Sequence, residues 1–90
     1  MANRTLVIGE QVACGTNSGA ASTFGNATVV RLCNNGSTAR LVAVVTAVGG
    51  TVVGSFTMPG NTVEFIEKKP TEAIFAADTS VLGTPVGYTN

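Results

Sequence analysis

The stretch of residues 40–68 constrains the fold most strongly, because it places two turn signals between runs rich in Val and Thr. Gly49-Gly50 is the first signal, and adjacent glycines accept the positive φ angles of the tight turns that join antiparallel strands. Pro59-Gly60 is the second signal, since Pro sets φ at the first central position of a turn and Gly accepts a positive φ at the next. The stretch therefore predicts three strands in a β-meander.

The alternation of side chains indicates which faces of these strands are buried, because neighbouring residues of a strand point to opposite faces. In the middle strand, Val52, Phe56 and Met58 share the face that we expect to meet the core, and Val53 lies on the other face. The preceding strand, over 41–48, is apolar on both faces. Two explanations stay open, a central strand between two layers or a strand with one face against another subunit.

Turn signals recur along the chain and separate short runs of strand-forming residues. About six to eight short strands favour an all-β fold, a small antiparallel β-sandwich or barrel, with one domain over residues 1–90. The segment 70–78 differs, with Pro70 at its start, Glu72 next and good helix formers afterwards. It predicts one short helical turn near residues 71–77, in which Ile74 and Phe75 close an open end of the β layers.

The composition predicts a surface with few charges. Charged residues make up 11% of the 90-residue chain, its net charge is +0 and its mean hydropathy is +0.36, whereas roughly 25% of the residues of a typical soluble domain are charged. We expect a partner, most simply copies of the same chain, to cover much of this surface; a neutral, Thr-rich monomer is the alternative. The sequence has neither the basic excess typical of nucleic-acid binding nor an apolar run of membrane-spanning length, so cytoplasmic synthesis is expected.

The long loop over residues 15–25 is small and polar apart from Phe24. We expect Phe24 to anchor the end of the loop to the core, and an exposed contact for a partner is the alternative. Cys14 and Cys33 lie in strand-like runs. Reduced, buried thiols are the favoured interpretation, and a disulfide is the alternative in an oxidising compartment.

The sequence offers few groups for catalysis or metal binding. It has no His, so the commonest general base is missing, and Ser and Thr lack a base to activate them. Two cysteines without His do not complete a zinc site. The acids are Glu10, Glu64, Glu67, Glu72 and Asp78. Glu64 and Glu67 fall on opposite faces of a strand and are expected to be solvated beside Lys68 and Lys69. We therefore expect no catalytic, cofactor-binding or metal-binding residues.

The last third of the chain carries a resemblance to a known class of proteins. The run from Val63 to Ala76, which contains Lys69-Pro70-Thr71-Glu72-Ala73-Ile74-Phe75, and the closing Val86-Gly87-Tyr88-Thr89-Asn90 resemble a pattern in small virion structural proteins of marine tailed phages, notably those that infect cyanobacteria. The resemblance implies a structural component of a virus particle and no functional residues.

The sequence and the resemblance together lead to one main hypothesis, a non-enzymatic capsid decoration or cement protein at the capsid surface. We expect it to bind copies of itself, with a trimer as the first expectation, and the major capsid protein. The expected contact residues are Arg4, Phe24, Val42, Val44 and Val53. A module of the tail, neck or fibre is the first alternative, and a receptor-binding or carbohydrate-binding module ranks lower because the chain has no Trp and a single Tyr.

Overall fold

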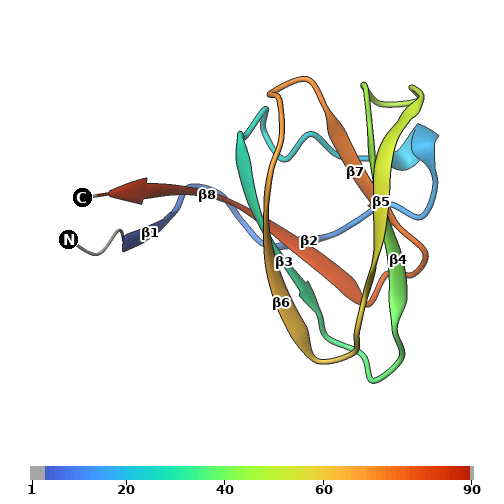
Figure 1. The fold of residues 1–90 in the computed structure, drawn as a ribbon. Coiled ribbons are helices and arrows are strands. Elements are labelled where there is room, and N and C mark those ends of the chain that lie inside the picture. The colour runs from blue at the N-terminus through green and yellow to red at the C-terminus, as the bar shows by residue number, and fades with distance from the viewer. Residues whose placement is uncertain (1–3, 90) are drawn as a thin grey trace.

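Two antiparallel β-sheets form the fold (Figure 1). The structure, a computed structural model, describes the backbone of residues 4–89 and the side chains of residues 5–87. The first sheet has the order β1-β8-β3-β6, with β2 also paired to β8, and consists of β1 (Arg4–Val7), β2 (Val12–Ala13), β3 (Val29–Asn34), β6 (Thr62–Glu67) and β8 (Val81–Thr89). The second sheet has the order β5-β4-β7 and consists of β5 (Val52–Met58), β4 (Arg40–Val45) and β7 (Ala73–Ala76). The predicted all-β, antiparallel class is confirmed. The predicted β-meander over residues 40–68 is wrong, because β4 and β5 pair in the second sheet whereas β6 crosses to the first sheet and pairs with β3.

The core lies between the two sheets and is built from alternate positions of their strands. In β3, Val30 and Leu32 are fully buried, while the residues next to them are half-buried. From the second sheet, Val42, Met58 and Ile74 are also fully buried and belong to the same cluster. Complete burial of an aliphatic side chain of this size contributes roughly 1.5–3 kcal/mol. This shared core holds the sheets face to face.

Phe24 anchors the long loop to the core, as predicted. Its side chain is buried, and its ring lies against Gly83 of β8, where an added Cβ would come within 2.5 Å of ring carbons. A residue with a side chain therefore does not fit at position 83 beside this ring. Phe24 has a φ of 52°, and Gly25 and Asn26 follow with 69° and 60°. The loop thus makes a left-handed turn, a conformation that bulky residues rarely adopt.

Both faces of β4 are covered within the single chain. Val42 lies in the core between the sheets, and Val44 packs against the same cluster. On the opposite face, Val45 is fully buried against Ala21 and Ala73. The predicted double covering is confirmed for residues 42–45 and not for Leu41 and Val48, which are 49% and 54% exposed. The first of its two explanations applies, because β4 is the central strand of its sheet with another layer on each side.

The loop before β3 supplies that outer layer and also occupies the edge of β7. Ser22 and Ile74 exchange two backbone hydrogen bonds of 3.0 and 2.9 Å, and the N–H of Ala76 donates to the carbonyl of Gly15 at 2.9 Å. Between these points lies the 3₁₀ turn η1 (Ser18–Ala20), which is hydrogen-bonded to the connection between β4 and β5. The chain's own backbone therefore pairs with the outer edge of the β5-β4-β7 sheet on the β7 side.

The helical turn predicted near residues 71–77 is wrong. Residues 73–76 form β7, in which Ile74 pairs opposite Val44 and Phe75 pairs opposite Ala43. Ile74 is fully buried and Phe75 is half-buried, so they belong to the two sides of the sheet rather than to a plug at its end. Pairing with β4 satisfies the backbone over four residues, whereas a single helical turn is unstable by itself.

A β-bulge in β5 overturns the predicted orientation of Val52. The register between β4 and β5 skips Val53, and Val52 pairs opposite Val45. One extra residue moves the side chains beyond it to the other face of the strand. Val52 is consequently 52% exposed, whereas Phe56 and Met58 contact the core as predicted.

β1 and the C-terminal half of β8 form a two-stranded ribbon that projects beyond the rest of the fold (Figure 1). The pairing of β3 with β8 ends at Val86, whereas β1 continues to pair as far as Thr89. Both ends of the described backbone therefore lie in the ribbon.

Candidate assembly surfaces

Large apolar side chains stay exposed in three regions of the described chain. Ten such side chains are between 43% and 62% exposed: Leu6, Val7, Ile8 and Val12 near the ribbon, Leu41, Val48, Val52 and Val53 on and beside β4 and β5, and Val63 and Phe65 on β6. Single exposed apolar residues are common on monomeric proteins, but grouped ones mark contact sites. These three groups are the candidate sites of this protein.

The ribbon surface consists of Leu6, Val7 and Ile8, which are 50%, 62% and 57% exposed. Consecutive residues of an extended chain point to opposite faces, so both faces of the ribbon carry apolar groups. The backbone is held in place, because Leu6 pairs with Gly87 and the N–H of Ile8 donates to the carbonyl of Pro85 at 3.1 Å. The ribbon is thus an apolar projection with an ordered backbone.

A pocket of about 440 Å³ lies where the ribbon joins the body. Apolar side chains of Ile8, Val12, Phe24 and Pro85 form much of its lining, and Glu10 contributes a carboxylate. The left-handed turn at Phe24 positions one wall. The pocket suits an apolar side chain of a partner better than a charged one, since among its lining residues only Glu10 is ionisable.

The β5 edge, defined as residues 53–58, has no strand partner on its outer side within the described part of the chain. It contains no charged residue. Val53, Ser55 and Thr57 are exposed, and a Cβ added at Gly54 would meet nothing within 4 Å. Bare edges of this kind accept further strands unless charges or prolines prevent it.

Within the described residues, β6 is the edge strand of the other sheet, and it is charged. Glu64 and Glu67 are exposed, as predicted. Phe65 lies between them and pairs opposite Arg31 of β3, and Val63 precedes Glu64. The outer face of β6 therefore combines exposed apolar residues with the carboxylate of Glu67.

The predicted contact residues have different outcomes. Val42 is wrong as a contact, because it is 0% exposed within the chain's own core, whereas Phe24 is 5% exposed, lines the pocket beside the ribbon and stays a predicted contact. Val44 packs partly against the same core. Val53 is 57% exposed on the β5 edge and stays a predicted contact. The side chain of Arg4 lies outside the described side chains.

Lys68 is a buried cation that sequence reasoning placed among solvated residues. Its side chain is 6% exposed, and its Nζ donates to the carbonyl of Ala27 at 2.6 Å and approaches those of Lys69 and Pro70 at 3.4 and 3.5 Å. Burial lowers the pKa of Lys68, and the nearby Glu72 carboxylate opposes this effect. Lys68 therefore ties two loops at one end of the sandwich by hydrogen bonds to their backbones.

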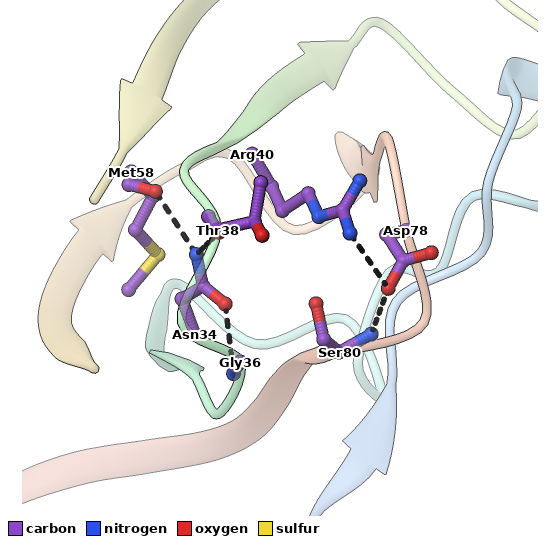
Figure 2. A network of polar contacts seen from close by, with 7 residues as sticks. All are labelled: Asn34, Gly36, Thr38, Arg40, Met58, Asp78 and Ser80. Carbon is purple, nitrogen blue, oxygen red and sulfur yellow. Dashed lines mark hydrogen bonds and ion pairs between the residues drawn. The ribbon is translucent and has the colours of Figure 1, made fainter. Parts of the chain in front are cut away.

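Asn34 likewise holds a set of turns by hydrogen bonds to their backbones (Figure 2). Its side chain is fully buried, and its Nδ2 donates to the carbonyls of Thr38 at 2.9 Å and Met58 at 3.0 Å. Its Oδ1 accepts from the N–H of Gly36 at 3.1 Å. One amide thus fixes the β3–β4 connection and the end of β5. No local pattern in the sequence indicates that the Asn34 amide is buried.

Arg40 and Asp78 form an ion pair of 3.8 Å beside this amide (Figure 2). The N–H of Ser80 donates to Oδ2 of Asp78 at 3.1 Å and lowers the pKa of that carboxyl, with a smaller effect from Arg40. Both ion-pair side chains are partly exposed, so the pair contributes little to stability. Arg40, Asp78 and Ser80 therefore support the turns beside the Asn34 amide.

The described residues contain little that could drive a reaction. Cys14 and Cys33 are free thiols, and burial raises the pKa of Cys14 to about 11, which disfavours the reactive thiolate. No group of three His, Cys, Asp or Glu side chains among the described residues could hold a metal ion. In the same part of the chain, no helix has the length and apolar character to cross a membrane.

Comparison of the chain with models of protein families, with curated proteins and with solved structures finds no match. The candidate function therefore depends on the exposed surfaces. The ribbon surface was missed at the sequence level. The exposure of Leu6, Val7 and Ile8 depends on how far β8 extends beyond β3, which no local pattern in the sequence indicates.

Proposed function

We propose that this chain is a non-enzymatic structural protein of a phage particle, a capsid decoration or cement protein that stabilises the shell. The observation that carries the proposal is the combination of ten exposed large apolar side chains with a charged fraction of 11%. An isolated protein of this kind has little charge repulsion to keep copies apart. Its surface is suited to permanent contact with other protein, and the sequence resemblance to virion proteins supports the particle as the setting.

The stabilising mechanism is mechanical. A small β-sandwich seated across a junction between capsid subunits buries apolar surface on both sides of the seam. Opening the seam then exposes that surface to water, at about 25 cal/mol per Å². Many copies around a shell multiply the effect. The ribbon of β1 and β8 projects from the body (Figure 1), and its exposed apolar residues Leu6, Val7 and Ile8 are proposed to meet the shell.

Particles made without the chain test this mechanism. They are expected to burst at lower temperature, or in milder osmotic shock, than particles that contain it, and addition of purified protein restores the resistance. Unchanged resistance would contradict the cement function. The number of copies per particle separates the alternatives, since hundreds of copies fit a shell component whereas a few to a few dozen fit a tail, neck or fibre module.

A variant pair tests the ribbon. Leu6→Asp combined with Ile8→Asp places charges on the ribbon surface, and Val63→Asp makes the same kind of change on β6, at a residue that is 43% exposed. The ribbon variant is expected to lose binding to stripped particles by more than tenfold, while the β6 variant keeps it. Equal binding by both variants would show that the ribbon is not the contact.

A further inference from the structure

We propose that two copies of this chain pair through their β5 edges, antiparallel and centred on Ser55, so that two three-stranded sheets join into one. The proposal specifies the self-association that is part of the proposed function. A strand edge presents unpaired backbone N–H and C=O groups, so its natural occupant is another extended segment. Beyond the bulge at Val53, residues 54–58 pair regularly with β4, which makes this stretch a straight template.

Charge favours a second β5 as the occupant. β5 carries no ionisable side chain, so two copies can approach without repulsion. β6, by contrast, would bring Glu64 and Glu67 of one copy towards those of the other, and like charges on paired strands are destabilising. The opposite edge of the β5-β4-β7 sheet is already paired with Gly15 and Ser22 of the chain itself.

The side chains of β5 fit those of a second β5 strand that runs antiparallel to it. With Ser55 opposite Ser55 of the second copy, Gly54 lies opposite Phe56, and Val53 lies opposite Thr57. The open space beside Gly54 can accept the half-buried ring of Phe56 from the other strand. A ring packed across a strand glycine and two β-branched residues face to face are both favourable cross-strand pairs. Such a contact closes on two copies and predicts a dimer in place of the trimer expected above.

Cysteine cross-linking tests the register. In a Cys33→Ser background, which leaves the buried Cys14 as the remaining native thiol, Ser55→Cys is expected to form a disulfide-linked dimer under mild oxidation, because directly opposed residues have Cα atoms about 4.5–5.5 Å apart. Thr57→Cys is the matched control on the same face. Its two copies would be separated by four residues of strand, about 13 Å, too far for a disulfide.

Sedimentation equilibrium of charge variants tests the edge independently. Val53→Lys is expected to weaken the dimer at least tenfold, and Val63→Lys, an equivalent change on β6, is expected to leave it unchanged. A monomer at all concentrations, equal cross-linking at positions 55 and 57, or a dimer that resists Val53→Lys would each overturn the proposal. Cross-linking of Ser55→Cys to a particle protein alone would overturn it as well. If copies do not pair through β5 but the chain still binds particles, the pairing proposal fails and the proposed function stands. If copies pair through β5 but the chain binds no particle, the pairing stands and the proposed function fails.

Discussion

The two edges of the β5-β4-β7 sheet differ in whether the chain's own backbone pairs with them. On the β7 side, Gly15 and Ser22 pair with the strand and the η1 loop covers the adjoining face. On the β5 side, no strand covers the edge within the described residues, although β5 is longer than β7. Natural sheets usually protect a bare edge with charges, prolines or covering loops. β5 has no charged residue, and the proposed pairing of two copies depends on this unprotected edge.

The same contrast separates the body from the ribbon. In the body, buried polar groups such as Asn34 and Lys68 bind the turns through backbone carbonyls. In the ribbon, ordered strands present apolar side chains to solvent. The molecule therefore combines a body held by buried polar contacts with a ribbon that exposes apolar side chains.

The largest expected effect comes from removing the amide that holds the end of β5. Asn34→Ala should lower the free energy of unfolding by about 3 kcal/mol, because the buried Met58 carbonyl, the partly buried Thr38 carbonyl and the Gly36 N–H lose their partner. Chemical denaturation measures the change. Asn35→Ala, at the exposed neighbouring position, should shift stability by less than about 0.5 kcal/mol. Equal effects would show that the amide does not hold the strand.

Substitution of two valines compares the stability contributed by the loop-covered strand β4 with that contributed by the exposed strand β5. Val45 and Val52 are opposite each other on neighbouring strands, but Val45 is fully buried under the η1 loop and Val52 is 52% exposed. Val45→Ala should destabilise the fold by about 2 kcal/mol through loss of buried contacts, and Val52→Ala by less than about 0.5 kcal/mol. Thermal unfolding of the two variants checks this. A similar loss in both would mean that the loop does not cover β4.

The pH dependence of stability reports on Cys14, which immediately precedes the covering loop. Burial raises its pKa to about 11, so between pH 9 and 11 the folded thiol stays protonated while the unfolded chain ionises. Stability is therefore full below pH 9 and falls by up to roughly 2 kcal/mol as the pH rises to 11. Cys14→Ala should lack this component. Identical pH profiles of the two proteins would place the thiol in contact with water.

The smallest expected effect is that of salt on self-association. Because β5 has no charged side chain, raising NaCl from 50 to 500 mM should change the dimer dissociation constant by less than about threefold. Sedimentation at the two salt concentrations provides the comparison. A change of more than tenfold would point to charged residues, such as those of β6, as the contact.

The sequence was sufficient to predict most of the strands but not how they pair or how the chain covers them. Alternating apolar residues and turn signals located the three strands of 40–68, but the predicted β-meander is wrong, because β4 and β5 pair in one sheet whereas β6 pairs with β3 in the other. The apolar residues on both sides of β4 indicated its double covering. The source of that cover, the polar loop with η1, has no apolar pattern of its own. The helix expected near residues 71–77 failed because pairing with β4 overrides a weak local preference.

The contact residues were harder to predict, since exposure depends on long-range packing. A one-residue bulge at Val53 turned Val52 outwards, and strict alternation cannot show an extra residue. Val42 was expected on a contact face, but the sheet of β3 and β8 covers it. The exposure of Leu6 and Val7 in β1 follows from the length of β8.

Sedimentation equilibrium of the purified chain, from about 10 μM to 1 mM, tests most directly whether its apolar surfaces serve assembly. The expected result is a mass that rises with concentration from 9.1 kDa towards twice that value. A mass that stays at 9.1 kDa over the whole range, in a protein that also leaves phage particles unchanged, would contradict the assembly function.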